Sequence, residues 1–475
     1  MSRLSMAQRL TYKPDLPKGE DQGVGCQTGG TYLRIKQLQD SSSCEIHDRL
    51  LRRIHFDVRD LDPWAGFFTF GGRQLSGDDV DHVLIVGAGI GGLAASAVLS
   101  RIASQVTLVE RAERPTEIGA ALALQPNGMA VLDRLGLLPR LLDVGTRIER
   151  MDIRSASGAV LATGKMPDLG DELDHAVAVR RTDLHRLLLD AATSSERVQT
   201  RFGCTVVSAD PAGAVIIKAG ADAVTTILPA DLVVGADGVG SVVRDTGGFD
   251  SRISAGSTYL RSIVPGWPDP LAQEYWTRLG SFGHAALSDH TTYFWAAADA
   301  PAVAEAVSGR DLASLIGKWR RVLPVAADLL EKVPSFDDLL VNTVRRVDCR
   351  RWFSGHLVLL GDAAHAMAPN LGQGANSALV DAVALAEELV TAPSLMQALA
   401  RYDQSRRPKT RRVQNAAGLL QRLCRLDQHI AVRARDAFFG GLNRIPRLAE
   451  AGIHQALAAD IHAVRSASVL AGPSR

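Results

Sequence analysis

Cysteine is scarce in this sequence, and its spacing carries no recognisable motif. Five cysteines occur in 475 residues, and they form neither a Cys-x-x-Cys pair nor a metal-site spacing with histidine: Cys26, Cys44, Cys204, Cys349 and Cys424. This scatter argues against a disulfide framework and against a structural zinc or other metal site. It suits the reducing cytoplasm, so we expect a cytoplasmic protein.

An excess of charge of one sign is also missing. The formal net charge is +1, which argues against a nucleic-acid partner and against a polybasic membrane-binding surface. No GxSxG elbow and no HExxH motif occurs, and no basic region followed by an apolar run marks a signal peptide. Val83 to Leu99 is strongly apolar, but four glycines between Gly87 and Gly92 break it, so we expect buried core and no membrane span. The oligomeric state stays open.

Residues 1–79 differ from the rest and predict a poorly ordered N-terminal extension. They show little helix or strand periodicity, and eleven basic residues balance eleven acidic ones. An aromatic cluster at Trp64, Phe67, Phe68 and Phe70 lies near the end of this extension. Because nucleotide-binding folds usually begin close to a chain's start, we hypothesise that the true start lies near Val80. A measured mass for the full 475 residues would exclude it.

The most informative segment follows directly, between residues 82 and 110. An apolar strand leads into Gly87-Ala-Gly89-Ile-Gly-Gly92, a helix of small residues and a second strand that ends at Glu110. In such a turn the first glycine permits the tight bend, the second lets backbone approach a pyrophosphate, and the third lets helix and strand pack closely. A terminal acid takes ribose hydroxyls. The segment predicts a dinucleotide site.

Two later motifs repeat the pattern of strand, acidic turn and helix. In the first, an apolar strand reaches Gly-Ala-Asp237-Gly, and Ser241 and Arg244 follow at a helix start. In the second, Leu357-Val-Leu-Leu-Gly-Asp362-Ala-Ala-His365 precedes Pro369-Asn-Leu-Gly372-Gln-Gly374. Either alone is also compatible with an Asp that caps a local helix. His365 is interpreted as structural support for the glycine loop.

In this order the three motifs resemble those of the single-component FAD-dependent aromatic hydroxylases, which include p-hydroxybenzoate and salicylate hydroxylase. The resemblance extends over roughly residues 80–423. Further matching segments are Gly119 to Gly136, Arg181-Thr-Asp-Leu, Tyr259-Leu-Arg261 and Arg401-Tyr-Asp to Pro408.

The resemblance implies an α/β fold, with a Rossmann-like FAD-binding domain, an inserted antiparallel-sheet substrate domain and C-terminal helices. Strand-rich stretches at 150–164, 206–229 and 257–298 suggest the inserted sheet. We expect the FAD-binding domain at 80–150, 166–250 and 346–390, the substrate domain at 151–165 and 251–345, and the helical region at 391–475.

The resemblance also implies roles for individual residues. Gly87, Gly89, Gly92 and Glu110 would hold the ADP half of FAD, with Arg181 near the pyrophosphate or ribityl chain. Asp362 would bind the ribityl hydroxyls. Pro369, Gly372 and Gly374 would line the isoalloxazine ring, and Asp237 to Arg244 would support FAD and transient nicotinamide binding. For Asp237 and Arg244 a purely local cap and ion pair stays the alternative.

The function implied is a monooxygenase that uses NADPH or NADH and O2 to hydroxylate a small aromatic or heteroaromatic compound through a flavin hydroperoxide. Candidates near substrate are Arg261, which suits an anionic group, His284, Tyr293 and Trp295, although packing roles are the simpler interpretation for the last three. The basic run from Arg406 to Arg412 is interpreted as a solvated helix face. Alternatives are an epoxidase or antibiotic-modifying monooxygenase of the same fold, and a non-catalytic flavoprotein-fold binding protein.

Overall fold

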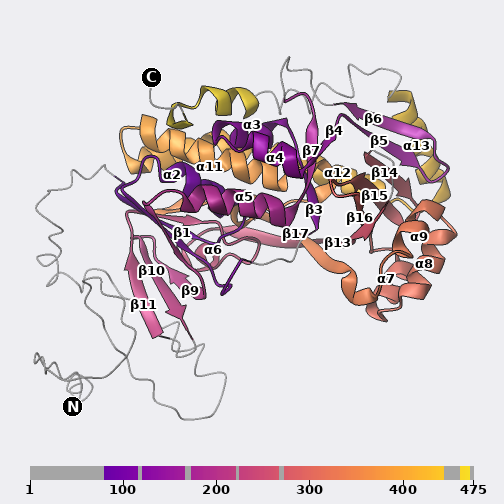
Figure 1. The fold of residues 1–475 in the computed structure, drawn as a ribbon, viewed down its shortest axis with the longest axis horizontal. Helices are drawn as coiled ribbons and strands as arrows, with labels where there is room; N and C mark the ends of the chain where they lie inside the picture. Colours follow the sequence, from indigo (N-terminus) through magenta and orange to yellow (C-terminus); the bar gives the residue numbers. More distant parts are fainter. Residues whose placement is uncertain are drawn as a thin grey trace, which may run out of the picture. The chain divides into compact units, whose positions relative to one another are not determined.

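The computed structural model describes residues 80–115, 120–165, 173–220, 224–266, 272–442 and 460–470. The predicted N-terminal extension, 1–79, lies outside these residues, and so does Gly119. Within the described residues no helix is both long enough and apolar enough to cross a membrane. Figure 1 gives the arrangement of the labelled elements.

The first sheet has six strands and carries all three sequence motifs. Its strand order is β18-β19-β12-β1-β2-β8. The strands are β1 (His82–Val86), β2 (Gln105–Val109), β8 (Val198–Arg201), β12 (Leu232–Gly235), β18 (Phe353–Ser354) and β19 (Leu357–Leu359). All neighbours except β18 and β19 pair in parallel. Because parallel strands put their carboxyl ends at one edge, the turns after β1, β12 and β19 meet there.

Helices cover this sheet and bury its apolar strands. They include α2 (Ile90–Leu99), α3 (Pro126–Arg134), α4 (Leu138–Val144), α5 (Arg181–Thr193) and α11 (Gly374–Thr391). Helix α2 is buried along almost its whole length, between α5 and α11. Its run of Ala, Gly and Ser lets neighbouring helices approach closely, which explains its unusual composition.

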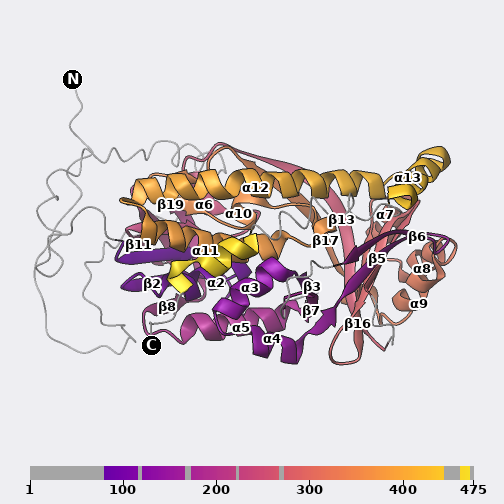
Figure 2. The ribbon, with the colours of Figure 1, turned by 90° about the horizontal axis from the view of Figure 1, so that it is seen from above.

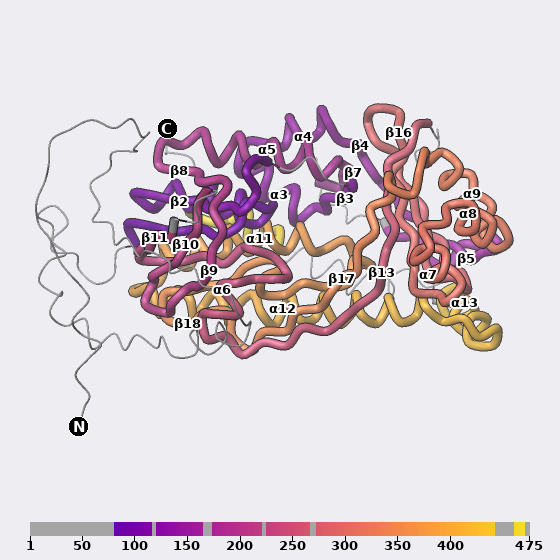
Figure 3. The backbone as a smooth tube through the Cα atoms, turned by 90° about the horizontal axis from the view of Figure 1, so that it is seen from below, coloured from indigo at the N-terminus to yellow at the C-terminus, as the bar shows by residue number. Residues whose placement is uncertain are grey.

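The second large sheet has seven strands and is largely antiparallel. Its order is β17-β13-β16-β15-β14-β5-β6, with one parallel pair, β14 and β5. The strands are β5 (Arg150–Ser155), β6 (Val160–Lys165), β13 (Ser251–Pro265), β14 (Ala272–Thr277), β15 (Gly280–Ala286), β16 (Thr291–Ala297) and β17 (Leu340–Cys349). The long strands β13 and β17 run from the six-stranded region into this sheet (Figure 3).

The two faces of the seven-stranded sheet have different neighbours. One face packs Leu260, Phe282 and Phe294 against three helices, α7 (Pro301–Ser308), α8 (Leu312–Arg320) and α9 (Pro324–Leu330). The other packs Ala285 and Tyr293 against a small sheet. That sheet consists of β3 (Ala121–Leu124), β4 (Thr146–Ile148) and β7 (Ala176–Arg180).

One strand-rich stretch does not join the inserted sheet. The strands β9 (Cys204–Ala209), β10 (Ala214–Ala219) and β11 (Val224–Pro229) form a separate antiparallel sheet of three strands. Val206, Val215 and Ile217 on it belong to the same apolar core as β1 and α2. The expectation that 206–229 contributes to the substrate sheet is therefore wrong, because its apolar face is buried in the core around the six-stranded sheet instead.

The remaining elements complete the site and the C-terminal region. They are α6 (Val242–Thr246), η2 (Phe336–Asp338), α10 (Asp362–His365), η3 (Pro369–Leu371), α12 (Leu395–Cys424), α13 (His429–Leu442) and η4 (Ser468–Leu470). Residues 460–466 are also helical. The residues that the structure describes after about residue 375 are mostly helical. In Figure 2 the long helix α12 runs along α11 and continues beyond it to α13.

Candidate functional site

The turn after β1 is built by contacts that only glycine allows. Gly87 has φ +101°, and a Cβ on Gly92 would lie 1.9 Å from the Gly87 carbonyl oxygen. At Gly89 no atom lies within 4 Å of an added Cβ. Two glycines of the motif are thus needed for packing, whereas the space above the third is open for a ligand to approach the backbone.

Glu110 closes this turn from the end of β2. Its Oε2 accepts a hydrogen bond from the Ala88 N–H at 2.8 Å, and its Oε1 accepts one from the Ala112 N–H at 2.9 Å. Each carboxylate oxygen can accept one bond more, so the carboxylate is oriented and still able to bind hydroxyls.

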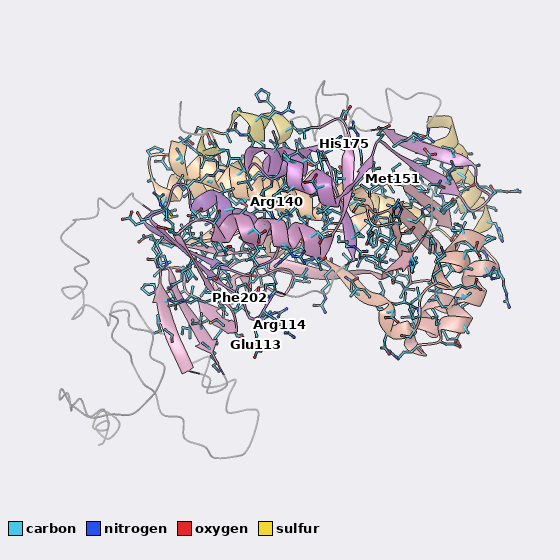
Figure 4. All side chains as sticks on the ribbon, viewed as in Figure 1. Glu113, Arg114, Arg140, Met151, His175 and Phe202 are labelled. Carbon is cyan, nitrogen blue, oxygen red and sulfur yellow. The ribbon has the colours of Figure 1, made fainter. Side chains whose placement is uncertain are left out.

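A cavity of about 120 Å³ lies directly beside Gly89 and Glu110. Arg181, the first residue of α5, also lines it. So do Arg114 and Phe202, which Figure 4 labels at the edge of the six-stranded sheet. One carboxylate and two guanidinium groups around a glycine turn fit the ribose and pyrophosphate of a dinucleotide. The sequence singled out neither Arg114 nor Phe202, because they follow their strands in irregular segments.

The second motif organises its own turn and reaches the third. Asp237 accepts hydrogen bonds from the N–H groups of Val242 and Val243, and Ser241 caps α6 through the Arg244 N–H. The buried Arg244 guanidinium donates to the carbonyls of Val239 and Ala363. Burial raises the pKa of Asp237, although its hydrogen bonds act in the opposite direction. The local role of both residues is thus visible in the geometry.

The third motif presents an exposed carboxylate above the start of a long helix. Gly361, with φ +59°, precedes Asp362, which is exposed at the beginning of α10. A Cβ on Gly374 would lie 4.0 Å from Asp362 Oδ1. Helix α11 begins at Gly374 without a side-chain cap, so the N–H groups of its first turn are available to a ligand with negative charge.

Beneath this turn lies a buried cluster of charges. Asp381 is fully buried, and its Oδ2 accepts the Gly361 N–H at 3.2 Å and faces His365 Nε2 at 2.5 Å. Arg406 Nε donates to Asp381 Oδ1 at 2.8 Å. Burial alone would raise the pKa of Asp381, but the charges of His365 and Arg406 outweigh it and the pKa is lowered. The expectation of a solvated basic run is wrong for Arg406, which is 3% exposed, because its guanidinium pairs inward.

The loop before α11 is held by neutral amides. Gln125 donates to the Leu371 carbonyl at 2.7 Å, and Gln373 donates to Gln125 Oε1 at 2.6 Å. Asn376 donates to the Gly372 carbonyl at 2.7 Å, where the backbone is left-handed. No local pattern connects Gln125 with a loop that lies 246 residues later. Pro369, Gly372 and Gly374 are thereby fixed on one loop.

This loop approaches one face of the seven-stranded sheet. Tyr259 on β13 donates through its hydroxyl to Asn370 Oδ1 at 3.3 Å. Arg261 lies two residues along the same strand and therefore on the same face. Its guanidinium lies over the Tyr259 ring at 5.4 Å, donates to Asn342 and interacts with Tyr293. These partners are all neutral, so they orient the cation without neutralising it.

His284, the histidine considered near substrate, is on the opposite face. In the strand register, Arg261 lies opposite Trp295, and Trp295 lies opposite Gly283. Because side chains alternate along a strand, His284, which follows Gly283, points to the other face. His284 pairs instead with Phe294, which packs against the helices α7 to α9. The structure therefore does not bring His284 to the face that approaches the glycine loop. Strand alternation decides this, and it depends on a register that the sequence does not reveal.

Trp295 and Glu274 continue the face that carries Arg261. A Cβ on Gly283 would lie 2.1 Å from the Trp295 ring, so the indole lies across the glycine. Trp295 Nε1 donates to Glu274 Oε2 at 3.2 Å, and Trp276 Nε1 donates to Oε1 at 2.8 Å. Burial raises the pKa of Glu274, and the two indole N–H groups partly offset this. The sequence predicted a packing role for Trp295 and none for Glu274.

Comparison with known proteins decides the family. Residues 81–417 match the model of a family described as an FAD binding domain. The chain belongs to the FAD-dependent aromatic hydroxylases. This hydroxylase is 33% identical over 359 residues to 3-amino-4-hydroxybenzoate 2-monooxygenase of Streptomyces cremeus. The aligned region covers 71% of this chain and 86% of that protein.

Two further proteins support the assignment. 3-Hydroxybenzoate 6-hydroxylase 1 of Aquipseudomonas alcaligenes is 30% identical over 359 residues, which cover 70% of this chain and 87% of that protein. A solved variant of 2-methyl-3-hydroxypyridine-5-carboxylic acid oxygenase has a TM-score of 0.64 and 25% identity, over 75% of this chain and 96% of that one. The predicted fold class, the cofactor FAD and the assignment as a monooxygenase are thereby confirmed.

Proposed function

We propose that this hydroxylase uses NADPH or NADH and O2 to hydroxylate a small aromatic or heteroaromatic compound that carries an anionic group. The observation that supports this best is Arg261. It is a half-buried cation with neutral partners, on the face that approaches the loop at Pro369 to Gly374. An oriented guanidinium favours a carboxylate or a phenolate.

The FAD is assigned to the chain's residues as follows. Gly87, Gly89 and Glu110 would hold its ADP half, with Arg181 at the pyrophosphate. Asp362 would bind ribityl hydroxyls, and the loop from Pro369 to Gly374 would border the ring. When bound, FAD supplies the hydride acceptance and the oxygen activation that no side chain provides. The open space above Gly89 and the exposed Asp362 carboxylate support this placement.

The protein's own contribution is orientation and charge. The uncapped N-terminus of α11 would favour negative charge on the ring edge next to Gly374. Arg261 would fix the substrate's anionic end, and the broad apolar surface of Trp295 suits a flat ring. Asp237 and Arg244 would support the cofactor indirectly, because their contacts hold the turn between the second and third motifs.

The experiment combines turnover with a matched pair of substrates. FAD-loaded enzyme is tested with ring compounds that differ only in having a carboxylate, and NADPH and NADH oxidation is measured together with hydroxylated product. For Arg261→Gln we expect KM for the carboxylate compound to rise by about tenfold to a hundredfold, as losing a charge-assisted hydrogen bond implies. KM for the neutral partner should change little, and Arg261→Lys should be intermediate.

Three results would contradict the proposal. An equal loss for charged and neutral compounds would remove the assigned role of Arg261. A yellow protein that never oxidises NADPH or NADH with any ring compound would instead support the non-catalytic binding protein. Epoxide formation without hydroxylation would support the epoxidase alternative.

A further inference from the structure

The C-terminal residues 460–470 return to the FAD-binding part of the hydroxylase and pack into its core. Ile461, Val464 and Leu470 are buried in the same apolar cluster as β1, α2 and α11. Figures 1 and 2 both show this yellow segment beside α3 and α11. Hydrogen bonds fasten it further: Arg134 donates to the Ala467 carbonyl, and the Val469 N–H donates to Glu387.

One residue of this segment connects to the charges beneath the FAD-binding turn. Asp460 Oδ1 accepts a hydrogen bond from Arg406 Nη1 at 2.8 Å, and Lys409 Nζ lies 3.7 Å away. The other side of the same guanidinium donates to Asp381, which in turn holds Gly361 and His365. A continuous path of charge-assisted contacts therefore runs from Asp460 to the turn that presents Asp362.

The charge balance along this path explains why Asp460 matters. Burial lowers the pKa of Arg406, but the charges of Asp381 and Asp460 raise it more, so the guanidinium is firmly cationic. Two carboxylates share this buried cation: Asp381 accepts from Nε of Arg406, and Asp460 accepts from Nη1. Without the charge of Asp460, Nη1 would keep at most a neutral acceptor, and the guanidinium would shift toward Asp381, the carboxylate that remains. Asp381 would then bind Gly361 and His365 less well.

We propose that Asp460 is a positioning residue for FAD, which acts through Arg406 and Asp381 to fix the turn that carries Asp362. The C-terminal segment thereby contributes to cofactor affinity although it lies outside the three motifs. This inference rests on the proposed placement of Asp362 at the ribityl chain. A merely structural Asp460 would lower stability and leave the affinity of the folded protein for FAD unchanged.

The test measures the Kd of the apo-protein for FAD by quenching of flavin fluorescence, well below the unfolding temperature of each variant. For Asp460→Asn we expect Kd to rise about tenfold, equivalent to about 1.4 kcal/mol. Asp460→Glu, which keeps the charge, should recover most of the affinity. Glu387→Gln is the matched control, because Glu387 fastens the same segment through Ser468 and Val469, and within the described part of the chain it bonds to neither Arg406 nor Asp381.

A double variant tests the path itself. If the effect passes through Asp381, Asp460→Asn should weaken FAD binding no further in an Asp381→Asn background, since coupled residues are not additive. A Kd of Asp460→Asn within twofold of wild type would overturn the proposal, and so would an equal loss in Glu387→Gln. Asp362→Ala separates the two hypotheses. If it keeps FAD, the placement of Asp362 is wrong, whereas normal FAD binding in Asp460→Asn alone contradicts only the role of Asp460.

Discussion

The two ends of the proposed FAD site are held in different ways. At Gly87 to Gly92 the backbone itself is packed so tightly that a Cβ on Gly92 would meet the Gly87 oxygen at 1.9 Å. At Gly361 to His365 the turn depends on side chains, with Asp381 binding the Gly361 N–H and facing His365. Steric fit fixes the first end, and buried charge fixes the second. The closest contact at the first end lies within the glycine motif itself, whereas the second end needs three separate helical segments.

The largest expected effect on stability comes from a substitution in the tightly packed turn at Gly87 to Gly92. Gly92→Ala should destabilise the fold by at least about 3 kcal/mol, because the added carbon meets backbone that cannot move aside easily. Gly89→Ala is the matched change in the same turn, with no atom within 4 Å of its Cβ. We expect Gly89→Ala to fold normally and to bind FAD more weakly. Urea unfolding and FAD content measure both. Equal stability of the two variants would contradict the steric explanation.

The next largest effect comes from removing the charge of Asp381 beneath the turn at Gly361 to His365. Asp381→Asn should cost about 3–5 kcal/mol at neutral pH, because it leaves Arg406 and His365 without their shared carboxylate. Since the folded pKa of Asp381 is lowered, its contribution is present above the ordinary pKa of an aspartate, near 3.9. It is lost as the pH falls through the lower, folded value.

Urea unfolding of wild type and Asp381→Asn at several pH values measures this contribution. The difference between the two proteins should be full at pH 7 and should shrink below about pH 4, where Asp381 takes up a proton first in the unfolded chain and, at lower pH, in the folded protein. Glu305→Gln, an exposed substitution on α7, serves as the control. A difference that stays constant down to acid pH would show that charge is not what holds this turn.

The same contrast explains how much of the site could be predicted from sequence. The turn at Gly87 and the acid at Glu110 lie within one unit of strand, helix and strand, so spacing alone reveals them. Arg406 lies in a run of basic residues that looks solvated, and its two partners lie on other elements. Asp460 was not predicted at all. Burial of a charge depends on distant segments, which a local pattern does not contain.

The fold itself followed the pattern more closely than the side-chain roles did. A Rossmann-like sheet and an inserted sheet were predicted from the strand–turn–helix motifs, the strand-rich stretches and the family resemblance. The stretch at 206–229 was expected to join the inserted sheet, although 166–250 was assigned to the FAD-binding domain, because its apolar alternation shows that one face is buried but not against which partner. Arg261 and His284 were both named as candidates near substrate, and strand register decides which face each one occupies.

The smallest expected effect concerns Asp237, a second buried aspartate, which can be compared directly with Asp381. Asp237 also lies at the site, but it binds backbone N–H groups and no cation, and burial raises its pKa instead of lowering it. A raised folded pKa means that its contribution to stability is full below the ordinary value and is lost as the pH rises through the folded value.

An Asn at position 237 keeps an oxygen that accepts from Val242 and Val243. Asp237→Asn should therefore change the free energy of unfolding by no more than about 1 kcal/mol at pH 7. Relative to wild type it should gain stability as the pH rises from 4 to 7, opposite in direction to Asp381→Asn, and urea unfolding at the same pH values measures it. If both substitutions follow the same pH trend, burial rather than pairing with a cation governs the two carboxylates.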